Sequence, residues 1–268
     1  MATTTNFGDA TTPSEGLVTW DSEGTEGGPN HSRVLNVPPG ASGLTLGRGY
    51  DMGSRSGPEI IQDLTDSDVT LDLARTISGA AGLRGQATRD FIVTNKLKQF
   101  EISKAGQKAL FVRTYALMKM DAQRVCTKPD VTQKYGVCDW AKLNDAIVQI
   151  LVDLRFRGDN RPDTRAIFQP SVVKNDLEAF AAVLKQSNNW TNVPADRFAR
   201  RNNFLATALS NERVIAALKK TVTDGMKTVT DGMKRVTDGM KRVTDGMKRV
   251  TAGVTTPATS RTQQLPKF

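Results

Sequence analysis

The feature that most restricts the fold of this chain is a seven-residue repeat near its C-terminus. The sequence Val-Thr-Asp-Gly-Met-Lys occurs four times, beginning at Val222, Val229, Val236 and Val243. Methionine and valine alternate at spacings of three and four, which is the pattern of a coiled-coil seam with Met at position a and Val at position d. Each repeat also holds one glycine, which costs about 1 kcal/mol in a helix relative to alanine. We therefore place the globular core in the residues before the repeat.

The repeat also carries most of the net charge. The formal charge of the chain is +9, and residues 219–268 contribute +7 of it through eleven Lys/Arg and four Asp. The remaining residues are close to neutral, which argues against a nucleic-acid-binding surface, so no specific nucleic-acid partner is expected. For the basic tail, 219–254, three interpretations stay open: a flexible or partly helical repeat expansion, a self-associating helix, or an element that binds polyanions. Residues 255–268 are expected to be disordered.

Several classes of protein are excluded by simple features of the sequence. The chain holds no run of eighteen apolar residues, so no transmembrane segment is expected. Its first thirteen residues are polar and contain no Lys or Arg, which predicts that there is no signal peptide. A single histidine, His31, argues against a Ser-His-Asp triad or a multi-histidine metal centre. Cys126 and Cys138 are too few for a disulfide scaffold or a zinc site, and whether they pair with each other stays open.

The N-terminal part of the chain predicts a short helix, a long loop and a small strand. Residues 1–11 are interpreted as a disordered leader. Residues 12–15 (Thr-Pro-Ser-Glu) form a capping-box sequence, which predicts a helix running to about Glu23 and ended by Gly24. The following residues are rich in Gly, Pro, Ser and Asn, and 43–46 predict a short strand before a glycine-containing turn.

After Pro58 the apolar residues follow a helical period. Residues 65–68 offer an N-cap for a helix that continues through Ile77, and the spacing of apolar residues predicts further helices over 110–118 and 143–154. Asn175 is expected to cap a helix over 177–184, and another helix is expected over 196–209. The predicted fold of 12–218 is α+β and mainly α, with a small N-terminal strand and loop lobe and a larger helical lobe.

Glu23 is the first candidate catalytic residue. At the end of the predicted helix, the negative end of the helix dipole disfavours a carboxylate, and Trp20 lies one turn back, where it can exclude water. Both effects raise the pKa of a carboxyl group. A glutamic acid that stays protonated near neutral pH is suited to act as a general acid.

A second carboxylate is needed if the reaction is the hydrolysis of a glycosidic bond. There is no Asp or Glu between Glu26 and Asp51, so Asp51, just after the glycine-containing turn, is the nearest downstream candidate, and Glu59 is more remote. Thr45 precedes Asp51 by six residues on the predicted strand, where its hydroxyl can hold an attacking water. Glu26 competes with Glu23 for the role of the acid.

These residues lie in a pattern that resembles a known family. Glu23-Gly24, followed after about twenty residues by the sequence Ser-Gly-Leu-Thr-Leu-Gly-Arg-Gly-Tyr-Asp-Met-Gly at 42–53, is similar to the pesticin-like muramidase domains, which have the fold of phage-type lysozymes. Residues 151–158 and 196–205 are similar to the helical lobe of these enzymes. The resemblance covers residues 14–216.

The resemblance implies a lysozyme-like fold and a muramidase activity. The substrate would be the glycan strand of peptidoglycan, and the reaction an inverting cleavage of the β-1,4 bond between N-acetylmuramic acid and N-acetylglucosamine. Glu23 matches the general acid of the family, and Thr45 and Asp51 match the residues that position water; no metal or organic cofactor is implied. The alternative is a non-catalytic module of the same fold that binds the cell wall or acts in assembly.

The implied biology is that of a bacteriolytic or antimicrobial toxin. Without a signal peptide, such a protein would be made in the cytoplasm and would act at the periplasm or cell wall, after delivery by a specialised route or by lysis. An immunity protein or a delivery protein is then an expected partner.

Overall fold

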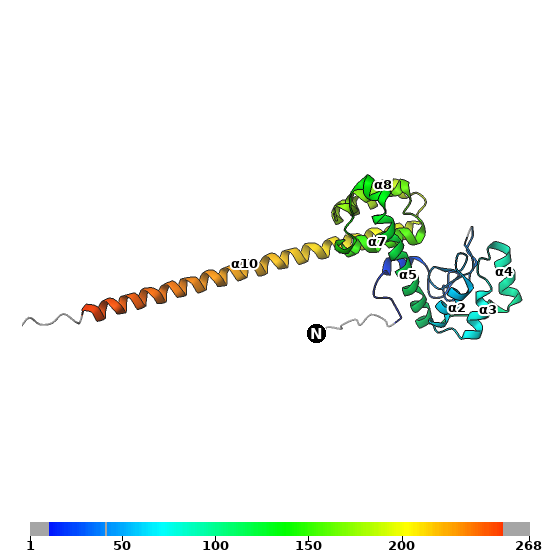
Figure 1. Ribbon diagram of the computed structural model, residues 1–268, viewed down its shortest axis with the longest axis horizontal. Helices are drawn as coiled ribbons and strands as arrows, with labels where there is room; N and C mark the ends of the chain where they lie inside the picture. The colour runs from blue at the N-terminus through cyan, green and yellow to red at the C-terminus, as the bar shows by residue number, and fades with distance from the viewer. Residues whose placement is uncertain (1–10, 41, 254–268) are drawn as a thin grey trace, which may run out of the picture. The chain divides into compact units, whose positions relative to one another are not determined.

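The computed structural model describes residues 11–40 and 42–253, and it is mainly helical with one small sheet (Figure 1). The chain divides into two compact units, Met1–Leu209 and Ser210–Phe268. The α+β, mainly α class predicted from the sequence is confirmed. The predicted leader, apart from residue 11, and the predicted disordered C-terminus lie outside the described residues.

The strand and loop part of the first unit is built around the three-residue turn 47–49. Strands β1 (Thr45–Leu46) and β2 (Tyr50–Asp51) pair antiparallel, with Thr45 opposite Asp51 and Leu46 opposite Tyr50. Leu46 and Tyr50 are buried in a core that the next helices cover. These helices are α2 (Gly57–Thr65), α3 (Leu71–Ser78) and α4 (Gly85–Thr94), and a 3-10 turn, Leu97–Gln99, follows them.

A long helix, α5 (Lys104–Thr127), links this part to a second group of helices (Figure 1). The second group holds α6 (Pro129–Tyr135), α7 (Asp145–Arg157), α8 (Pro162–Val173), α9 (Leu177–Leu184) and the 3-10 turns Trp140–Lys142 and Ser187–Trp190. Helix α7 lies at the centre of its own core because its apolar residues recur at helical spacing and are buried on nearly every side. Trp20, Phe111 and Val152 belong to a third cluster, whose residues come from α1, α5 and α7.

The first helix is shorter than the sequence predicts. Helix α1 spans Leu17–Ser22, and the capping box expected at residues 12–15 does not form. Gly16 is the N-cap and has a left-handed backbone (φ 78°), which interrupts any helix entering from residue 13. The ring of Tyr115 packs against Gly16 so closely that a Cβ atom there would lie 2.4 Å from its Cε2. Tertiary packing on α5 therefore overrides the local capping signal.

Two other expected caps are displaced by a few residues. Residues 65–68 end α2 and lead to α3, whose N-cap is Thr70. Asp176, and not Asn175, caps α9 by accepting a hydrogen bond from the backbone of Ala179. Asn175 has a positive φ of 52°, and its side chain hydrogen-bonds to the backbone of Lys142 and Asn144. It thus joins the start of α7 to the turn before α9.

The repeat is helical in the structure. Helix α10 spans Ala195–Gly253, so the predicted helix over 196–209 is confirmed and the helix continues through the repeat. Its first part, to Leu209, belongs to the first unit, where Leu205 is buried. None of the described helices is long and apolar enough to cross a membrane.

The two cysteines are buried and adjacent. Their sulfur atoms lie 2.8 Å apart, and the Gln169 side chain donates a hydrogen bond to Cys126 Sγ. The hydrogen bond between the two thiols, together with the one from Gln169, lowers the pKa of Cys126, and the same contact between the thiols raises the pKa of Cys138. We therefore expect Cys126 to ionise before Cys138 and to be the thiol that attacks an oxidant.

We expect oxidised glutathione to join Cys126 to Cys138 with release of two molecules of reduced glutathione. Titration of the denatured chain with a thiol reagent should find two thiols before this treatment and none after it. Closing so short a loop should stabilise the fold by about 3 kcal/mol, measured as a raised melting temperature. The Cys138→Ser variant is the control, and equal melting of oxidised and reduced wild type would contradict the prediction.

Candidate active site

Glu23 ends helix α1. It is the C-cap residue, and its backbone N–H donates to Thr19 O at 3.0 Å. Its side chain is 19% exposed, and burial raises the pKa of its carboxyl group against the opposing effect of Arg197. The direction agrees with the prediction made from the sequence, and burial is its largest cause.

Thr45 and Asp51 are brought together by the hairpin. Directly opposite residues of an antiparallel pair project their side chains on the same face of the sheet. Because Leu46 and Tyr50 are buried in the core, Thr45 and Asp51 lie on the other, half-exposed face.

A cavity of about 400 Å³ connects the end of α1 with this hairpin. Glu23, Thr45 and Gly49 line it, together with residues of the 24–38 loop and two residues at the start of α10, Asp196 and Arg200. A volume in this range suits a small organic ligand such as a sugar ring. Asp51 is not among the described residues that line the cavity.

The carboxylate of Asp51 holds the chain on both sides of the hairpin together. Its Oδ1 accepts hydrogen bonds from the backbone N–H groups of Gly43 at 2.9 Å and Gly53 at 2.7 Å. These two glycines pack so tightly that a Cβ atom on Gly43 would lie 2.4 Å from the Cα of Gly53. Asp51 therefore has a structural task at the base of the hairpin, and only its Oδ2 is left for other contacts.

The glycine-containing turn lies directly against the Glu23 carboxyl group. Gly49 has a φ of 86°, and a Cβ atom there would lie 2.4 Å from the Phe156 ring and 3.3 Å from Glu23 Oε2. A glycine is required here by both the backbone conformation and the lack of space.

Arg48, between the two turn glycines, fixes the hairpin to α1. Its guanidinium lies over the Trp20 ring, 4.1 Å from the centroid, and donates to the backbone oxygens of Trp20 (2.6 Å) and Gly24 (2.5 Å). These are carbonyls at the C-terminal end of the helix, where a cation is favoured. Arg48 is thus a positioning residue that the sequence argument did not identify.

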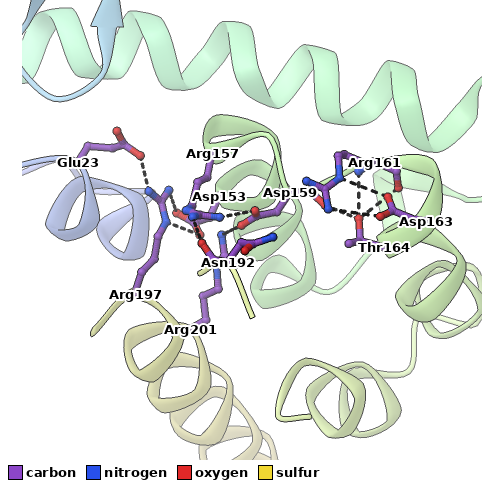
Figure 2. Close-up of polar contacts among 10 residues, drawn as sticks. All are labelled: Glu23, Asp153, Arg157, Asp159, Arg161, Asp163, Thr164, Asn192, Arg197 and Arg201. Carbon is purple, nitrogen blue, oxygen red and sulfur yellow. Dashed lines mark hydrogen bonds and ion pairs between the residues drawn. The ribbon is translucent and has the colours of Figure 1, made fainter. Parts of the chain in front are cut away.

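Glu23 also belongs to a network of ion pairs that joins α1, α7 and α10 (Figure 2). Arg197 donates to Glu23 Oε1 and to Asp153 Oδ1, both at 2.6 Å. Arg201, one turn further along α10, donates to Asp153 Oδ2 at 2.6 Å and to Asp159 Oδ2 at 2.8 Å. Three carboxylates and three guanidinium groups take part, because Arg157 also pairs with Asp159.

The network engages only one oxygen of the Glu23 carboxyl group. Oε2 points away from Arg197 (Figure 2) and has no hydrogen-bond partner among the residues that the structure describes. Arg197 is shared with Asp153, which is fully buried, and the pKa of Asp153 is lowered because Arg201 and Arg197 outweigh the effect of burial. Arg197 thus pairs with Asp153 as well as with Glu23. Its effect on Glu23 is smaller than the effect of burial, so the pKa of Glu23 stays raised.

Glu26, the competing candidate, has the opposite environment. Its carboxylate accepts hydrogen bonds from Arg33 at 2.8 Å and Gln107 at 2.7 Å, and Arg48 lies at 3.7 Å. Although burial acts to raise the pKa of Glu26, these contacts outweigh it and lower the pKa. A carboxylate held in the ionised state is poorly suited to donate a proton.

The sequence contained signals for part of this network. Asp153 stands among apolar residues on α7, in the sequence Leu-Val-Asp-Leu, and a charged residue in a buried stretch requires a partner. Arg197 and Arg201 are four residues apart, which places them on one face of a helix. What the sequence did not show is that these side chains meet one another and Glu23.

Across 11–40 and 42–253, no group of three or more His, Cys, Asp or Glu side chains is placed to hold a metal ion. His31, on the loop that borders the cavity, contacts Glu101 Oε1 at 3.1 Å through Nε2.

Comparison with known proteins gives a family without an assigned activity. None of the curated proteins searched matches the chain. A family model described as a domain of unknown function, DUF8812, matches residues 16–202. The matched region holds Glu23, the hairpin and the three arginines of the ion-pair network, Arg157, Arg197 and Arg201. Since the model covers more than half of the sequence, the chain belongs to the DUF8812 family.

Proposed function

We propose that the protein is a peptidoglycan hydrolase of lysozyme-like fold, a muramidase that cleaves the β-1,4 bond between N-acetylmuramic acid and N-acetylglucosamine. The observation that carries the proposal is the environment of Glu23. Its carboxyl group is largely buried, has a raised pKa, and lines a cavity together with Thr45, and one of its oxygens has no hydrogen-bond partner among the described residues. A raised pKa favours the protonated form of a carboxyl group, and this is the form that a glycosidase needs in its general acid.

In the proposed reaction the proton of Glu23 goes to the glycosidic oxygen. The bond from the anomeric carbon to that oxygen breaks, and its electron pair stays on the leaving sugar. Water, held by the Thr45 hydroxyl and by Asp51 Oδ2, attacks the anomeric carbon from the opposite face and gives its proton to the Asp51 carboxylate, so the product has the inverted configuration. No cofactor takes part. The enzyme would act at the periplasm or cell wall, with an immunity protein or a delivery protein as a partner.

A non-catalytic cell-wall-binding module is the second candidate. Two observations favour it: Asp51 uses Oδ1 to hold its own hairpin and does not line the cavity, and Glu23 takes part in an ion pair. Such a module would keep the cavity for binding a glycan strand without cleaving it.

Incubation of the full chain with purified peptidoglycan separates the two candidates. A muramidase releases fragments with N-acetylmuramic acid at the reducing end, which borohydride reduction and mass spectrometry identify, and NMR of the first product shows the inverted anomer. Co-sedimentation with peptidoglycan and no new reducing ends would favour the binding module. A first product with retained configuration at the anomeric carbon would contradict the inverting route but not the muramidase activity.

We expect the pH dependence of turnover to follow Glu23. Because its pKa is raised above 4.5, the acid form persists to higher pH, and kcat/KM falls as pH rises through that pKa. Arg197 lowers the pKa of Glu23, so Arg197→Gln should move this limb of the profile to higher pH. Arg157 lowers the pKa of Glu23 by less, so Arg157→Gln should shift the profile in the same direction but by a smaller amount. This variant replaces Arg197→Gln in the test if Arg197→Gln does not fold.

The matched control is Arg200→Gln. Arg200 also lines the cavity and loses the same charge, but it pairs with Asp196 at 2.9 Å and is not among the groups that shift Glu23. In Arg200→Gln, kcat/KM should fall with rising pH at the same pH as in the wild type, even if KM changes. An unshifted limb in both Arg197→Gln and Arg157→Gln would show that another group supplies the proton.

A further inference from the structure

The second unit presents a continuous apolar stripe to solvent. Between residues 222 and 250 its valine and methionine side chains are each 59–69% exposed. We call these nine residues the Met–Val seam: Val222, Met226, Val229, Met233, Val236, Met240, Val243, Met247 and Val250. A stripe of this length on a soluble helix is unusual unless something covers it.

The period of the seam points to the kind of partner. A straight α-helix has 3.6 residues per turn, so a stripe that repeats every seven residues drifts by about 20° per heptad. The stripe stays in contact with a neighbour only if the two helices supercoil around each other. The best-matched neighbour is therefore another helix with the same seven-residue repeat, which a second copy of this chain supplies.

The placement of charge agrees with a helical partner. The positions beside the seam, e and g, are occupied by threonine and glycine, such as Thr230 and Gly232. The charged residues of each repeat lie on the side of the helix opposite the seam. Asp231 precedes Lys234 by three residues and Arg235 by four, and both spacings favour ion pairs within one helix. An interfacial helix on an anionic membrane would instead profit from lysines beside its apolar face.

We propose that the Met–Val seam associates with the same segment of other copies of the chain in a coiled coil of more than two helices. The expected number of strands follows from the residue types, because an unbranched residue at a with a β-branched residue at d disfavours the two-stranded form. Since the Val-Thr-Asp-Gly-Met-Lys units are identical, a shift of seven residues restores the same contacts along the seam, and the register is therefore not fixed to a single value. This proposal does not depend on the proposed enzymatic activity.

The test is the mass of the full chain in solution, measured by sedimentation velocity over a range of protein concentrations. The wild type should sediment as a concentration-dependent oligomer of three or more chains. Val236→Gln with Val243→Gln places amides in two layers of the seam and should weaken association more than about tenfold. Glutamine favours a helix at least as much as valine does, so this loss would not reflect a loss of helix propensity.

Arg235→Gln with Arg242→Gln is the matched control, since it changes neighbouring residues outside the seam and should leave the mass distribution unchanged. A monomeric wild type at all concentrations, or equal behaviour of both double variants, would overturn the proposal. So would a wild type that stays monomeric and binds vesicles of anionic lipid through the seam. For the register, a chain lacking one repeat, 236–242, should co-assemble with the full chain; separate assemblies of the two lengths would overturn the sliding register.

Discussion

Glu23→Gln is expected to lower peptidoglycan turnover by about a thousandfold, within the range that general acids contribute. The amide has nearly the shape of the carboxyl group, and its oxygen can still accept the hydrogen bond from Arg197 that now reaches Oε1 at 2.6 Å. What it lacks is a proton that it can transfer. The measurement is the rate of appearance of reducing ends on purified peptidoglycan, with binding followed separately by co-sedimentation.

The same variant should not lose stability at neutral pH. The raised pKa of Glu23 means that its surroundings, burial above all, oppose the ionised form more than the arginine favours it. Between the ordinary value of 4.5 and the folded pKa, the folded state binds more protons than the unfolded state, so ionisation costs stability as pH rises. Glutamine removes that cost, and a melting temperature equal to or above the wild-type value is expected.

Glu26→Gln is the matched control for this prediction. It makes the same chemical change three residues away, at a carboxylate that is 38% exposed and held by Arg33 and Gln107. We expect turnover within a few fold of the wild type and a modest loss of stability, because the pKa of Glu26 is lowered by these contacts. Wild-type turnover in Glu23→Gln would show that Glu23 is not the general acid. A loss of turnover in Glu26→Gln alone would assign that role to Glu26.

The sequence predicted the parts of this protein that depend on local signals. The apolar spacing of 143–154 predicted α7, and residues 43–46 predicted a short strand before a glycine-containing turn, although the second strand, β2, was not predicted. The position of Glu23 at a helix end was also correct, although the helix begins at Leu17 and not near Pro13. These features need no knowledge of distant residues.

The parts that failed depend on contacts between distant segments. The start of α1 is decided by Tyr115, about a hundred residues away, whose ring packs against Gly16. The surroundings of Glu23 are decided by Arg197, 174 residues further along the chain. No local pattern reports such contacts, so the direction of the pKa shift could be predicted but the competition between burial and the arginine could not.

Asp153→Asn is expected to cause the largest loss of stability in the protein, about 3–5 kcal/mol in the free energy of unfolding. Asp153 is fully buried and holds Arg197 and Arg201 through both carboxylate oxygens. Asparagine leaves these two buried guanidinium groups with one counter-charge fewer. Chemical denaturation of the full chain measures the loss. Asp163→Asn is the control, because Asp163 and its partner Arg161 are exposed to solvent and the free energy of unfolding should change little.

The cause of this loss can be separated from a simple loss of packing by two further measurements. If an uncompensated cation is responsible, Asp153→Asn combined with Arg201→Met should be more stable than Asp153→Asn alone, since the second change removes one unpaired charge. The folded pKa of Asp153 is lowered below 3.8, so the unfolded state binds more protons between the two values. The stability that Asp153 supplies is thus complete above 3.8 and lost as pH falls through the folded pKa, and the difference between wild type and Asp153→Asn should shrink in that acid range. A difference that stays constant with pH, together with a double variant no more stable than the single one, would mean that Asp153 acts through packing and not through its charge.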